Sequence, residues 1–476
     1  MKGSLFALPL LSLLLTACAM GPNYTRPEVP VPESYRLAAA EKEAQSIADL
    51  PWWELLHDEE LQKLVRIALS ENKDLQGAAA AVEEFQARLG GGELGFAPQL
   101  TATANAPFGR LHALNIPRTA TATSYYLQGN LSWELDIWGR VRRANEAARA
   151  DLLAQEENRR AVILELISGV AQSYFDLRQF DLQLQITKNS LQSWEESIGI
   201  ANARLRQGVT SRLDADQFEA ERANAVARAA ELARAIAQKE SELSVLLGRN
   251  PSQVPRGRPL TEQEMPPEVP AGLPSYLLQR RPDILRSEGA LAAATARIGE
   301  AKAARFPTIS LTGVLGVASP QLSGIGKETF GSAGGGVIAP ILNARTLGYE
   351  QRVAEAQARQ VLAQYERTVL VAFKEVEDAL VTVRTAQDQS KAQEVQVAAL
   401  QSALHLAEVR YKGGISNYLE VLTAKRNLFD AQLALTASRR LHLASVVQLY
   451  KALGGGWKQE GAFDTADTAE GENNDD

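Results

Sequence analysis

Hydrophobic residues recur every seven positions in the middle of the chain, and at steps of four and three in its last third. The first series is Val170, Leu177, Leu184, Leu191, Ile198 and Leu205, and the second is Val361, Tyr365, Val369, Phe373, Val376, Leu380 and Val383. Both spacings are typical of coiled-coil seams, and the sevenfold step predicts a left-handed supercoil. An ordinary buried helical bundle is the alternative that this pattern alone leaves open.

The positions of the prolines indicate how far these helices extend. All twenty prolines lie at or before Pro340, and none falls between Pro117 and Pro251. Two long stretches therefore lack the strongest helix breaker. At about 1.5 Å per residue, a helix over 141–207 would be on the order of 100 Å long, which is more than one globular core requires.

Each long helix is predicted to end in a tight turn that leads into a second helix. Gly208 and Gly414 stand where a left-handed C-cap is needed, and Thr210, Ser211 and Ser416 follow where the next helix needs a side-chain oxygen at its N-cap. The sequence therefore predicts two antiparallel helical hairpins, 141–207 with 211–247 and 344–412 with 416–453.

Four short segments alternate apolar and polar residues and predict β-strands with one apolar and one polar face. They cover about 98–106, 124–135, 307–317 and 329–341, and the last is Gly-rich with weak alternation. Strands of about ten residues fit the length that spans a bilayer. The same alternation is equally typical of a half-buried sheet in a soluble protein, so the pattern by itself leaves both interpretations open.

The two halves of the chain repeat one another. Residues 203–248 align without a gap onto 409–454 at an offset of 206, which pairs Gly208 with Gly414 and Gly248 with Gly454. A unit of this length is too long for a solenoid repeat, whose period reaches roughly 50 residues. We therefore expect a duplicated half-structure, with a first repeat over 58–250, a linker over 251–280 and a second repeat over 281–456.

The N-terminus resembles the signal peptide of a bacterial lipoprotein. Residues 1–17 combine Lys2 with an apolar run that is too short to span a membrane, and Leu15 to Cys18 resemble a lipobox. The sequence predicts that Cys18, the single cysteine, is lipidated and that 18–57 forms an extended N-terminal segment.

The charge of the chain is concentrated in its tail. From Lys458 onward seven acidic residues face one lysine, a balance of minus six out of a net charge of minus seven. Residues 457–476 are therefore predicted to be an acidic, disordered tail, and the rest of the chain is nearly neutral. This balance gives no indication of nucleic-acid binding.

Four strands are too few to close a membrane barrel, because the smallest need about eight and an open edge is not tolerated in lipid. If the strands enter a bilayer, the barrel must be shared between copies of the chain. Two copies would give eight strands with an interior filled by side chains, whereas three would give twelve strands and a lumen. Transport through the barrel would favour three copies.

Several segments resemble the outer membrane efflux proteins, and most closely the OprM-like lipoproteins related to TolC. The segments are CAMGPNYTRPEVPVP (18–32), PWWELLHDEELQKLVRIALSENKDL (51–75), WELDIWGRVRRA (133–144), LLQRRPDILRSEGAL (277–291), AARFPTISLTG (303–313), RYKGGISNYLEVLTAKRNLFDAQ (410–432) and LYKALGGGW (449–457). They cover almost the whole mature chain in the family's order.

This resemblance implies a mixed α/β membrane protein that is mostly helical. It would be a homotrimer with a twelve-stranded β-barrel among the outer membrane lipids, a long α-helical barrel in the periplasm and an equatorial domain. It would be anchored by a palmitate-type lipid and conduct small molecules, including antibiotics, received from a periplasmic adaptor and an RND-type inner membrane transporter. Two alternatives remain: a TolC-like duct for type I protein secretion, and a lipid-anchored periplasmic adaptor.

The resemblance also implies a periplasmic gate near the second turn. It assigns a constricting residue to Leu419 and a basic gate residue to Arg426. Thr423 occupies the usual place of an acidic residue, so Glu420, Asp214 or Asp216 would have to supply the anionic partner. The adaptor would dock on the two turns, which are Gly208, Val209 and Thr210 in the first and Gly414, Ile415 and Ser416 in the second.

Signals of an enzyme are weak in this sequence. The histidines His57, His112, His405 and His442 are scattered, and no Cys-His cluster suggests a metal site. The glycines at 90, 92 and 95 spell GxGxxG, but they follow a predicted helix and precede a strand, which is the reverse of a dinucleotide-binding motif. We interpret them as a helix stop, and we expect no catalysis, cofactor or metal.

Overall fold

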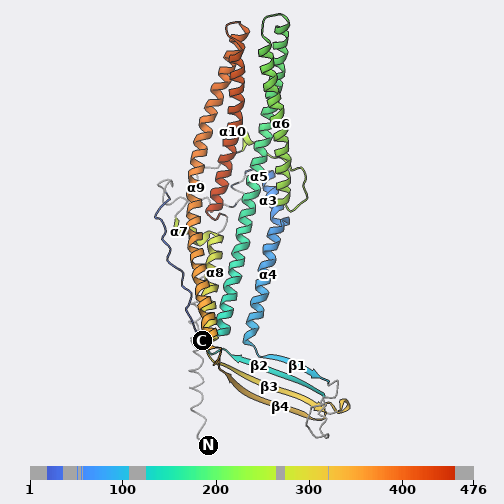
Figure 1. Ribbon diagram of the computed structural model, residues 1–476, viewed down its shortest axis with the longest axis vertical. Coiled ribbons are helices and arrows are strands. Elements are labelled where there is room, and N and C mark those ends of the chain that lie inside the picture. Colours follow the sequence, from blue (N-terminus) through green and yellow to red (C-terminus); the bar gives the residue numbers. More distant parts are fainter. Residues whose placement is uncertain are drawn as a thin grey trace, which may run out of the picture. The chain divides into compact units, whose positions relative to one another are not determined.

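The computed structural model describes residues 19–35, 51, 55, 57–106, 125–263, 274–319 and 321–455. The predicted signal peptide, Cys18 and the acidic tail lie outside these residues. The fold is mostly helical with one four-stranded sheet, and the two predicted hairpins are present (Figure 1). No helix in the described part of the chain is both long and apolar enough to cross a membrane.

The chain divides into two compact units that do not coincide with the two sequence repeats. The first comprises Met1–Glu28, Ala80–Glu156 and Arg286–Arg367, and the second comprises Val29–Ala79, Glu157–Leu285 and Thr368–Asp476. Each unit therefore draws on both repeats. The reason is that α5 (Arg140–Arg206) and α9 (Ala344–Lys412) are each long enough to contribute residues to both units.

The sheet of the first unit contains β1 (Gln99–Asn105), β2 (Tyr125–Leu135), β3 (Thr308–Ser319) and β4 (Thr329–Ile338) in that order, all antiparallel. Its register aligns the apolar rows predicted from each strand. Leu100 pairs with Leu131, which pairs with Gly313, while Trp133 pairs with Leu311. β4 ends three residues earlier than predicted, and pairing with β3 defines the faces that its weak alternation left undefined.

Two shorter helices and the N-terminal segment accompany the sheet in the first unit. α8 (Pro282–Ala303) lies within this unit from residue 286, and α4 (Lys73–Glu93) from residue 80. Arg143 donates to the Met20 carbonyl at 3.0 Å and to Asn23 Oδ1 at 2.7 Å, and Arg26 donates through Nε to Glu288 Oε1 at 2.7 Å. These contacts attach the extended N-terminal segment to helices from both repeats.

The glycines that we interpreted as a helix stop lie close to the end of α4. The helix continues through Gly90 and Gly92 to Glu93, and a 3-10 turn over Leu94–Phe96 then leads into β1. The order helix, glycines, strand is therefore observed, although the helix ends slightly later than the first glycine suggested.

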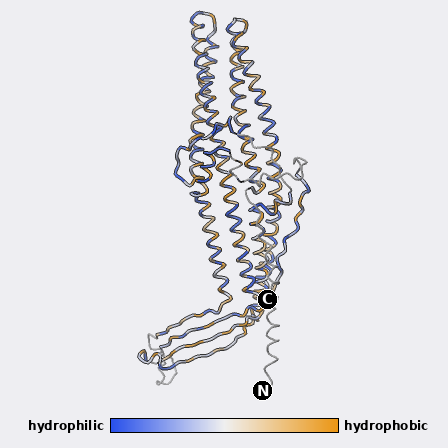
Figure 2. Tube along the Cα trace, turned by 180° about the vertical axis from the view of Figure 1, so that it is seen from behind, coloured by the Kyte–Doolittle hydropathy of each residue, from blue (hydrophilic) through white to orange (hydrophobic). Residues whose placement is uncertain are grey.

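The second unit contains most of the two hairpins and two short helices. α5 pairs with α6 (Arg212–Leu246), and α9 pairs with α10 (Tyr418–Ala452). α3 (Glu59–Glu71) and α7 (Pro274–Arg280) are the short helices. Short hydrophilic and hydrophobic stretches follow one another along the long helices (Figure 2). This is expected where apolar residues recur every three to four positions.

The repeat extends to the junctions at which each hairpin closes. Asn72, at the end of α3, donates to the Leu246 carbonyl at 2.9 Å, and Arg281, at the end of α7, donates to the Ala452 carbonyl at 3.1 Å. The two acceptors are separated by the same 206 residues as the sequence repeats. The residue that follows each short helix therefore donates to a carbonyl at the end of α6 or α10, which has no partner within its own helix.

One predicted helix start is wrong. Ser211 caps α6 by accepting from the Asp214 N–H at 3.4 Å, but α10 begins at Tyr418 with Asn417 as its N-cap residue. The repeat pairs Asn417 with Ser211, so Ser416 corresponds to Thr210 and belongs to the turn. The Ser416 hydroxyl is buried without a hydrogen-bond partner among the described residues.

We predict that Gly248→Ala destabilises the protein more than Gly208→Ala. Both glycines have a φ of 73°, where an L-residue costs about 1–2 kcal/mol. A Cβ at Gly208 meets open space, whereas a Cβ at Gly248 would lie 2.2 Å from the Glu71 carbonyl oxygen and force the backbone to move. Thermal unfolding followed by circular dichroism measures the difference, and equal losses for the two variants would contradict it.

Candidate functional site

The two hairpin turns have the same geometry. Gly208 and Gly414 have φ values of 73° and 74°. The Val209 N–H donates to the Arg204 carbonyl at 3.0 Å, and the Ile415 N–H donates to the Arg410 carbonyl at 2.9 Å. These are the hydrogen bonds of a Schellman motif, which needs glycine at the left-handed position.

Each turn exposes one large apolar side chain. Val209 is 68% exposed and Ile415 is 75% exposed in the single chain. Exposed aliphatic side chains on a well-formed turn can be buried by another protein. The two turns thus present equivalent exposed apolar side chains, among the residues to which the family resemblance assigns adaptor docking.

The predicted gate residues lie on the exposed face of α10. Leu419 is 54% exposed, Arg426 is exposed, and Thr423 is half-buried between them. Glu420 Oε2 lies 3.5 Å from Arg410 Nε of α9. Glu420 thus contacts a cation of its own hairpin.

The other two predicted anionic partners are also engaged locally. Asp214 accepts a hydrogen bond from Thr210, and Asp216 lies 3.6 Å from Arg212 one helical turn away. Among the described residues of the single chain, no ion pair joins Arg426 to Glu420, Asp214 or Asp216. The structure therefore does not bring the predicted ionic latch together within one copy.

A buried aromatic cluster joins the two hairpins near the start of α10. Phe218 of α6 lies with its ring centroid 3.9 Å from that of Tyr418 of α10 and 6.0 Å from that of Trp194 of α5. Ala407 of α9 belongs to the same buried cluster. Burial raises the pKa of Tyr418, and the nearby Tyr411 and Asp214 act in the same direction. All four long helices are thus in apolar contact near their turns.

Lys425 is a site residue that sequence analysis missed. Its side chain is only 12% exposed, and its Nζ donates to Ser193 Oγ at 2.8 Å and to Ser197 Oγ at 2.9 Å, both on α5. Glu408 of α9 lies 3.8 Å away. Lys425 therefore connects three helices from a position next to Arg426.

The pKa of Lys425 is lower than that of an exposed lysine. Burial lowers it, and the attraction of Glu408 and Glu196 only partly compensates. The sequence did carry a signal for this burial, since Lys425 stands one helical turn beyond the buried Val421.

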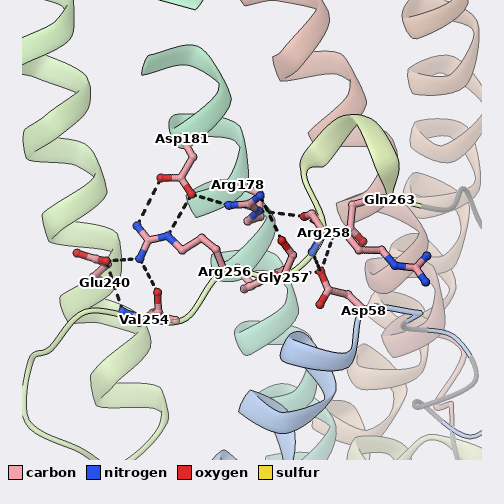
Figure 3. Close-up of polar contacts among 10 residues, drawn as sticks. Asp58, Arg178, Asp181, Glu240, Val254, Arg256, Gly257, Arg258 and Gln263 are labelled. Carbon is pink, nitrogen blue, oxygen red and sulfur yellow. Dashed lines mark hydrogen bonds and ion pairs between the residues drawn. The ribbon is translucent and has the colours of Figure 1, made fainter. Parts of the chain in front are cut away.

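The described part of the predicted linker between the repeats is held by three carboxylates, two of which belong to the first hairpin (Figure 3). Asp181 of α5 accepts from Arg256 at 3.2 Å and from Arg178 at 2.9 Å, and Arg256 also pairs with Glu240 of α6. The chain from 251 to 263 is thereby held against α5 and α6.

Asp58, the N-cap residue of α3, is the third carboxylate. It accepts from the Arg258 N–H at 2.9 Å, from Gln263 Nε2 at 2.7 Å and from the Tyr174 hydroxyl at 2.9 Å. Burial acts to raise the pKa of Asp58, but the hydrogen bonds outweigh it and the pKa is lower than its ordinary value. The N-cap of α3 thus also fixes the linker.

The apolar face of the sheet carries large exposed side chains. Leu100 is 74% exposed, Leu315 is 71% and Val337 is 67%, one on each of three strands. The opposite face is mostly polar, and Asn130 there donates to Thr103 Oγ1 at 3.2 Å. An apolar face of this extent requires a cover such as lipid or protein.

No group of three or more His, Cys, Asp or Glu side chains that could hold a metal ion occurs among the residues that the structure describes. The candidate functional sites of the described residues are surfaces and helix contacts. They are the two turns, the exposed face of α10, Lys425 and the apolar face of the sheet.

The chain is similar to outer membrane channels of efflux systems in sequence and in structure. The toluene efflux pump outer membrane protein TtgC of Pseudomonas putida is 36% identical, and the match covers 97% of both chains. The cation efflux system protein CusC of Escherichia coli is 34% identical over 94% of this chain and 98% of CusC. The solved open state of the MtrE outer membrane channel of Neisseria gonorrhoeae superimposes with a TM-score of 0.83 at 33% identity, covering 92% of this chain and 98% of that one.

The sequence model of the outer membrane efflux proteins matches both repeats, at residues 64–249 and 273–455. These matches include both hairpins, both turns and all four strands. The chain therefore belongs to the outer membrane efflux protein family.

Proposed function

We propose that this protein is the exit duct of a tripartite efflux pump and works as a homotrimer. Three copies would place their sheets in one twelve-stranded barrel in the outer membrane, and their hairpins in a helical tube in the periplasm. The observation that carries the proposal is the four-stranded sheet with its exposed apolar face. Among the described strands, β1 and β4 each pair on one side only.

The sheet explains why more than one copy is needed. Unpaired backbone groups at a strand edge cost several kcal/mol each in hydrocarbon, so β1 and β4 need partners. Closure by β1 of one copy against β4 of the next satisfies both edges. Three copies give a barrel wide enough for a lumen, with the apolar face toward lipid and the polar face inward.

The cargo of such a duct is small molecules. The relatives that this chain resembles are named for efflux of different substances, toluene for TtgC and cations for CusC. A common channel architecture for such unlike cargo indicates that selection takes place in the partner transporter. This observation favours small-molecule efflux over protein secretion for the present chain as well.

The proposed duct works with two partners, as the family of tripartite pump components implies. A periplasmic adaptor would contact the exposed Val209 and Ile415 at the turns and shift the tube toward its open arrangement. An inner membrane transporter of the RND type would supply the energy. Lipidation of Cys18 and delivery to the outer membrane complete the proposal, and the lipidation stays a prediction.

The first prediction of this proposal concerns assembly and conduction. The purified protein in detergent should have the mass of three copies, because the four-stranded sheet needs two further sheets to close. The same preparation should form ion-conducting pores in a planar bilayer. Native mass spectrometry together with single-channel recording measures both properties. A stable single-chain mass without pore formation would contradict the proposal.

The gate residues give a second prediction. Leu419 and Arg426 lie seven residues apart on one face of α10, where three copies would bring each residue to the axis of the tube. Leu419→Ala should raise single-channel conductance by removing apolar bulk, and Arg426→Ala should raise it if charge also holds the tip closed. An increase with Leu419→Ala alone would indicate a steric gate. Unchanged conductance in both variants would show that the gate lies elsewhere.

Lys425 gives a third prediction. Lys425→Met should raise conductance, because it releases α10 from Ser193 and Ser197 of α5. The free energy of unfolding should change little, since the variant removes the desolvation cost of a buried charge and Glu408 is half-exposed to water. Lys63→Met, at an ammonium paired with Glu60 on an exposed face of α3, is the matched control and should change neither property.

The pH dependence of stability tests the lowered pKa of Lys425 separately from its contacts. Because the pKa of Lys425 is lower when folded, the unfolded chain binds that proton more tightly. The contribution of Lys425 to stability therefore rises as the pH increases from the lowered pKa toward the ordinary one. Lys425→Met should remove this rise, which denaturation at a series of alkaline pH values measures. A variant that unfolds much more readily at neutral pH would contradict the prediction.

A further inference from the structure

The four described strands carry almost no charge. Glu134 is the only charged residue in β1 to β4. The turn between β3 and β4, where the structure describes it, adds one charge of each sign, Lys327 and Glu328. The polar face is otherwise formed by uncharged groups, such as the amides of Gln128 and Asn130, which share a hydrogen bond of 2.9 Å. Any net charge on this face of the strands must therefore come from Glu134.

The register places Glu134 on the polar face, at the end of the sheet where β2 leads into α5. Asn130, Ser132 and Glu134 alternate along β2, so their side chains share one face. Ser132 pairs with Gln99 of β1. Gln99, Ser132 and Glu134 line a cavity of about 310 Å³ together with Arg140, the first residue of α5. The carboxylate thus shares this cavity with a cation.

Arg140 holds the Glu134 carboxylate through two hydrogen bonds. Its Nε donates to Oε1 at 3.0 Å and its Nη2 donates to Oε2 at 2.7 Å, which is the two-point geometry that arginine makes with carboxylates. The hydrogen bond to Glu134 raises the pKa of Arg140, and nearby Glu300 and Asp136 act in the same direction. The side chains of Arg140 and Glu134 are 40% and 29% exposed, so the pair stays in contact with water.

The neighbouring arginine of α5 is engaged by a different carboxylate. Arg142 Nε donates to Asp136 Oδ2 at 3.1 Å, and the Arg142 N–H donates to the same oxygen at 2.9 Å. Asp136 and Glu134 are thus each matched by their own arginine. Loss of the Arg140 guanidinium would leave Glu134 without the cation that the structure gives it.

We propose that Arg140 is a specificity-determining residue of the duct, because it cancels the charge of Glu134 and so keeps the barrel lumen open to cations and anions alike. This inference rests on the proposed trimeric duct, in which the polar face of the sheet lines the lumen. Three Glu134 carboxylates would then stand at one level of the barrel, each matched by an Arg140 guanidinium. The cargo that the barrel admits is thus small molecules of either charge.

The effect of an unmatched carboxylate would be local. Charges on the wall of a water-filled lumen concentrate ions of opposite sign and exclude ions of like sign. Salt limits the range of this field to about 8 Å at physiological ionic strength. Thr312 is a suitable place for a probe, because it is exposed and stands two residues along β3 from Ser310, the pairing partner of Glu134. Two residues of a strand span roughly 7 Å.

The test measures the charge of the lumen through a cysteine at this position. Thr312→Cys in the full-length protein, reconstituted in lipid vesicles, is treated with a cationic or an anionic methanethiosulfonate, and mass spectrometry follows both rates. The ratio of cationic to anionic rate should be close to that of a small uncharged thiol free in solution. Adding Arg140→Gln should raise the ratio several-fold, because Glu134 then attracts the cationic reagent.

Two further variants separate the charge effect from a structural role of the ion pair. Glu134→Gln should lower the ratio, because Arg140 is then the unmatched charge. Glu134→Gln/Arg140→Gln should bring the ratio back toward that of Thr312→Cys alone, although it removes the same hydrogen bonds. The shifts should shrink at about 1 M salt, where the range of the field falls to about 3 Å. A purely structural pair would move the two rates together and leave their ratio unchanged.

Controls distinguish failure of this inference from failure of the duct. Cys18 is the only native cysteine, so the wild-type chain treated in parallel reports its reactivity. Leu315→Cys, on the apolar face, should react with neither reagent, because lipid covers it. Reaction of Leu315→Cys as fast as Thr312→Cys would overturn the barrel and with it this inference.

The variants themselves decide the role of Arg140. A ratio that Arg140→Gln leaves unchanged, with Leu315→Cys protected, would overturn the inference and leave the duct proposal standing. If Arg140→Gln does not assemble, Glu134→Gln decides the question by itself. A fall in its ratio supports the inference, and an unchanged ratio overturns it.

Discussion

Apolar packing between the two helical hairpins is the interaction on which the second unit depends. Val170 and Leu177 of α5 and Leu449 of α10 are completely buried, and Phe218 of α6 is 1% exposed. Shortening one such side chain to alanine typically costs about 2–5 kcal/mol, whereas an exposed ion pair contributes about 0–1 kcal/mol. The apolar seams therefore supply the stability, and polar contacts such as that of Gln172 with Gln448 fix which residues lie opposite one another.

The linker between the repeats depends on that packing. Tyr174 is completely buried in α5 and binds Asp58, and Asp58 in turn binds the backbone at Arg258. Gly257 is required beside Asp58, because a Cβ at this position would lie 2.1 Å from the carboxylate. A helix cap, a buried tyrosine and a glycine thus place the beginning of the connection between the repeats on the first hairpin.

The sheet follows a different constraint. Its strands bury little in the single chain, and hydrogen bonding between strands holds them in register. Leu100 and Leu131 pair directly on the apolar face, where their contact is made across neighbouring strands and not with a core. The same chain therefore combines one unit that is stable through its own apolar packing with a sheet whose apolar face needs an external cover.

The sequence by itself determined the elements and their order. The seven-residue period and the absence of proline gave both hairpins, and the left-handed turns at Gly208 and Gly414 were read directly from glycine at a helix end. The alternation of polar and apolar residues gave four strands, and the resemblance to a known family gave the function. These features are local, because periodicity and backbone conformation depend on neighbours along the chain.

The tertiary structure decided those features that depend on contacts between residues distant in the sequence. β4 acquires its two faces only by pairing with β3, since its glycines carry little alternation of their own. The burial of Lys425 depends on Ser193 and Ser197, more than 200 residues earlier. The start of α10 at Tyr418, with Asn417 as its N-cap residue, is a property of the folded backbone. The predicted partners of Arg426 were already engaged by nearby residues of their own hairpins. Periodicity places a side chain on a face, but only the packed helices determine which charges meet.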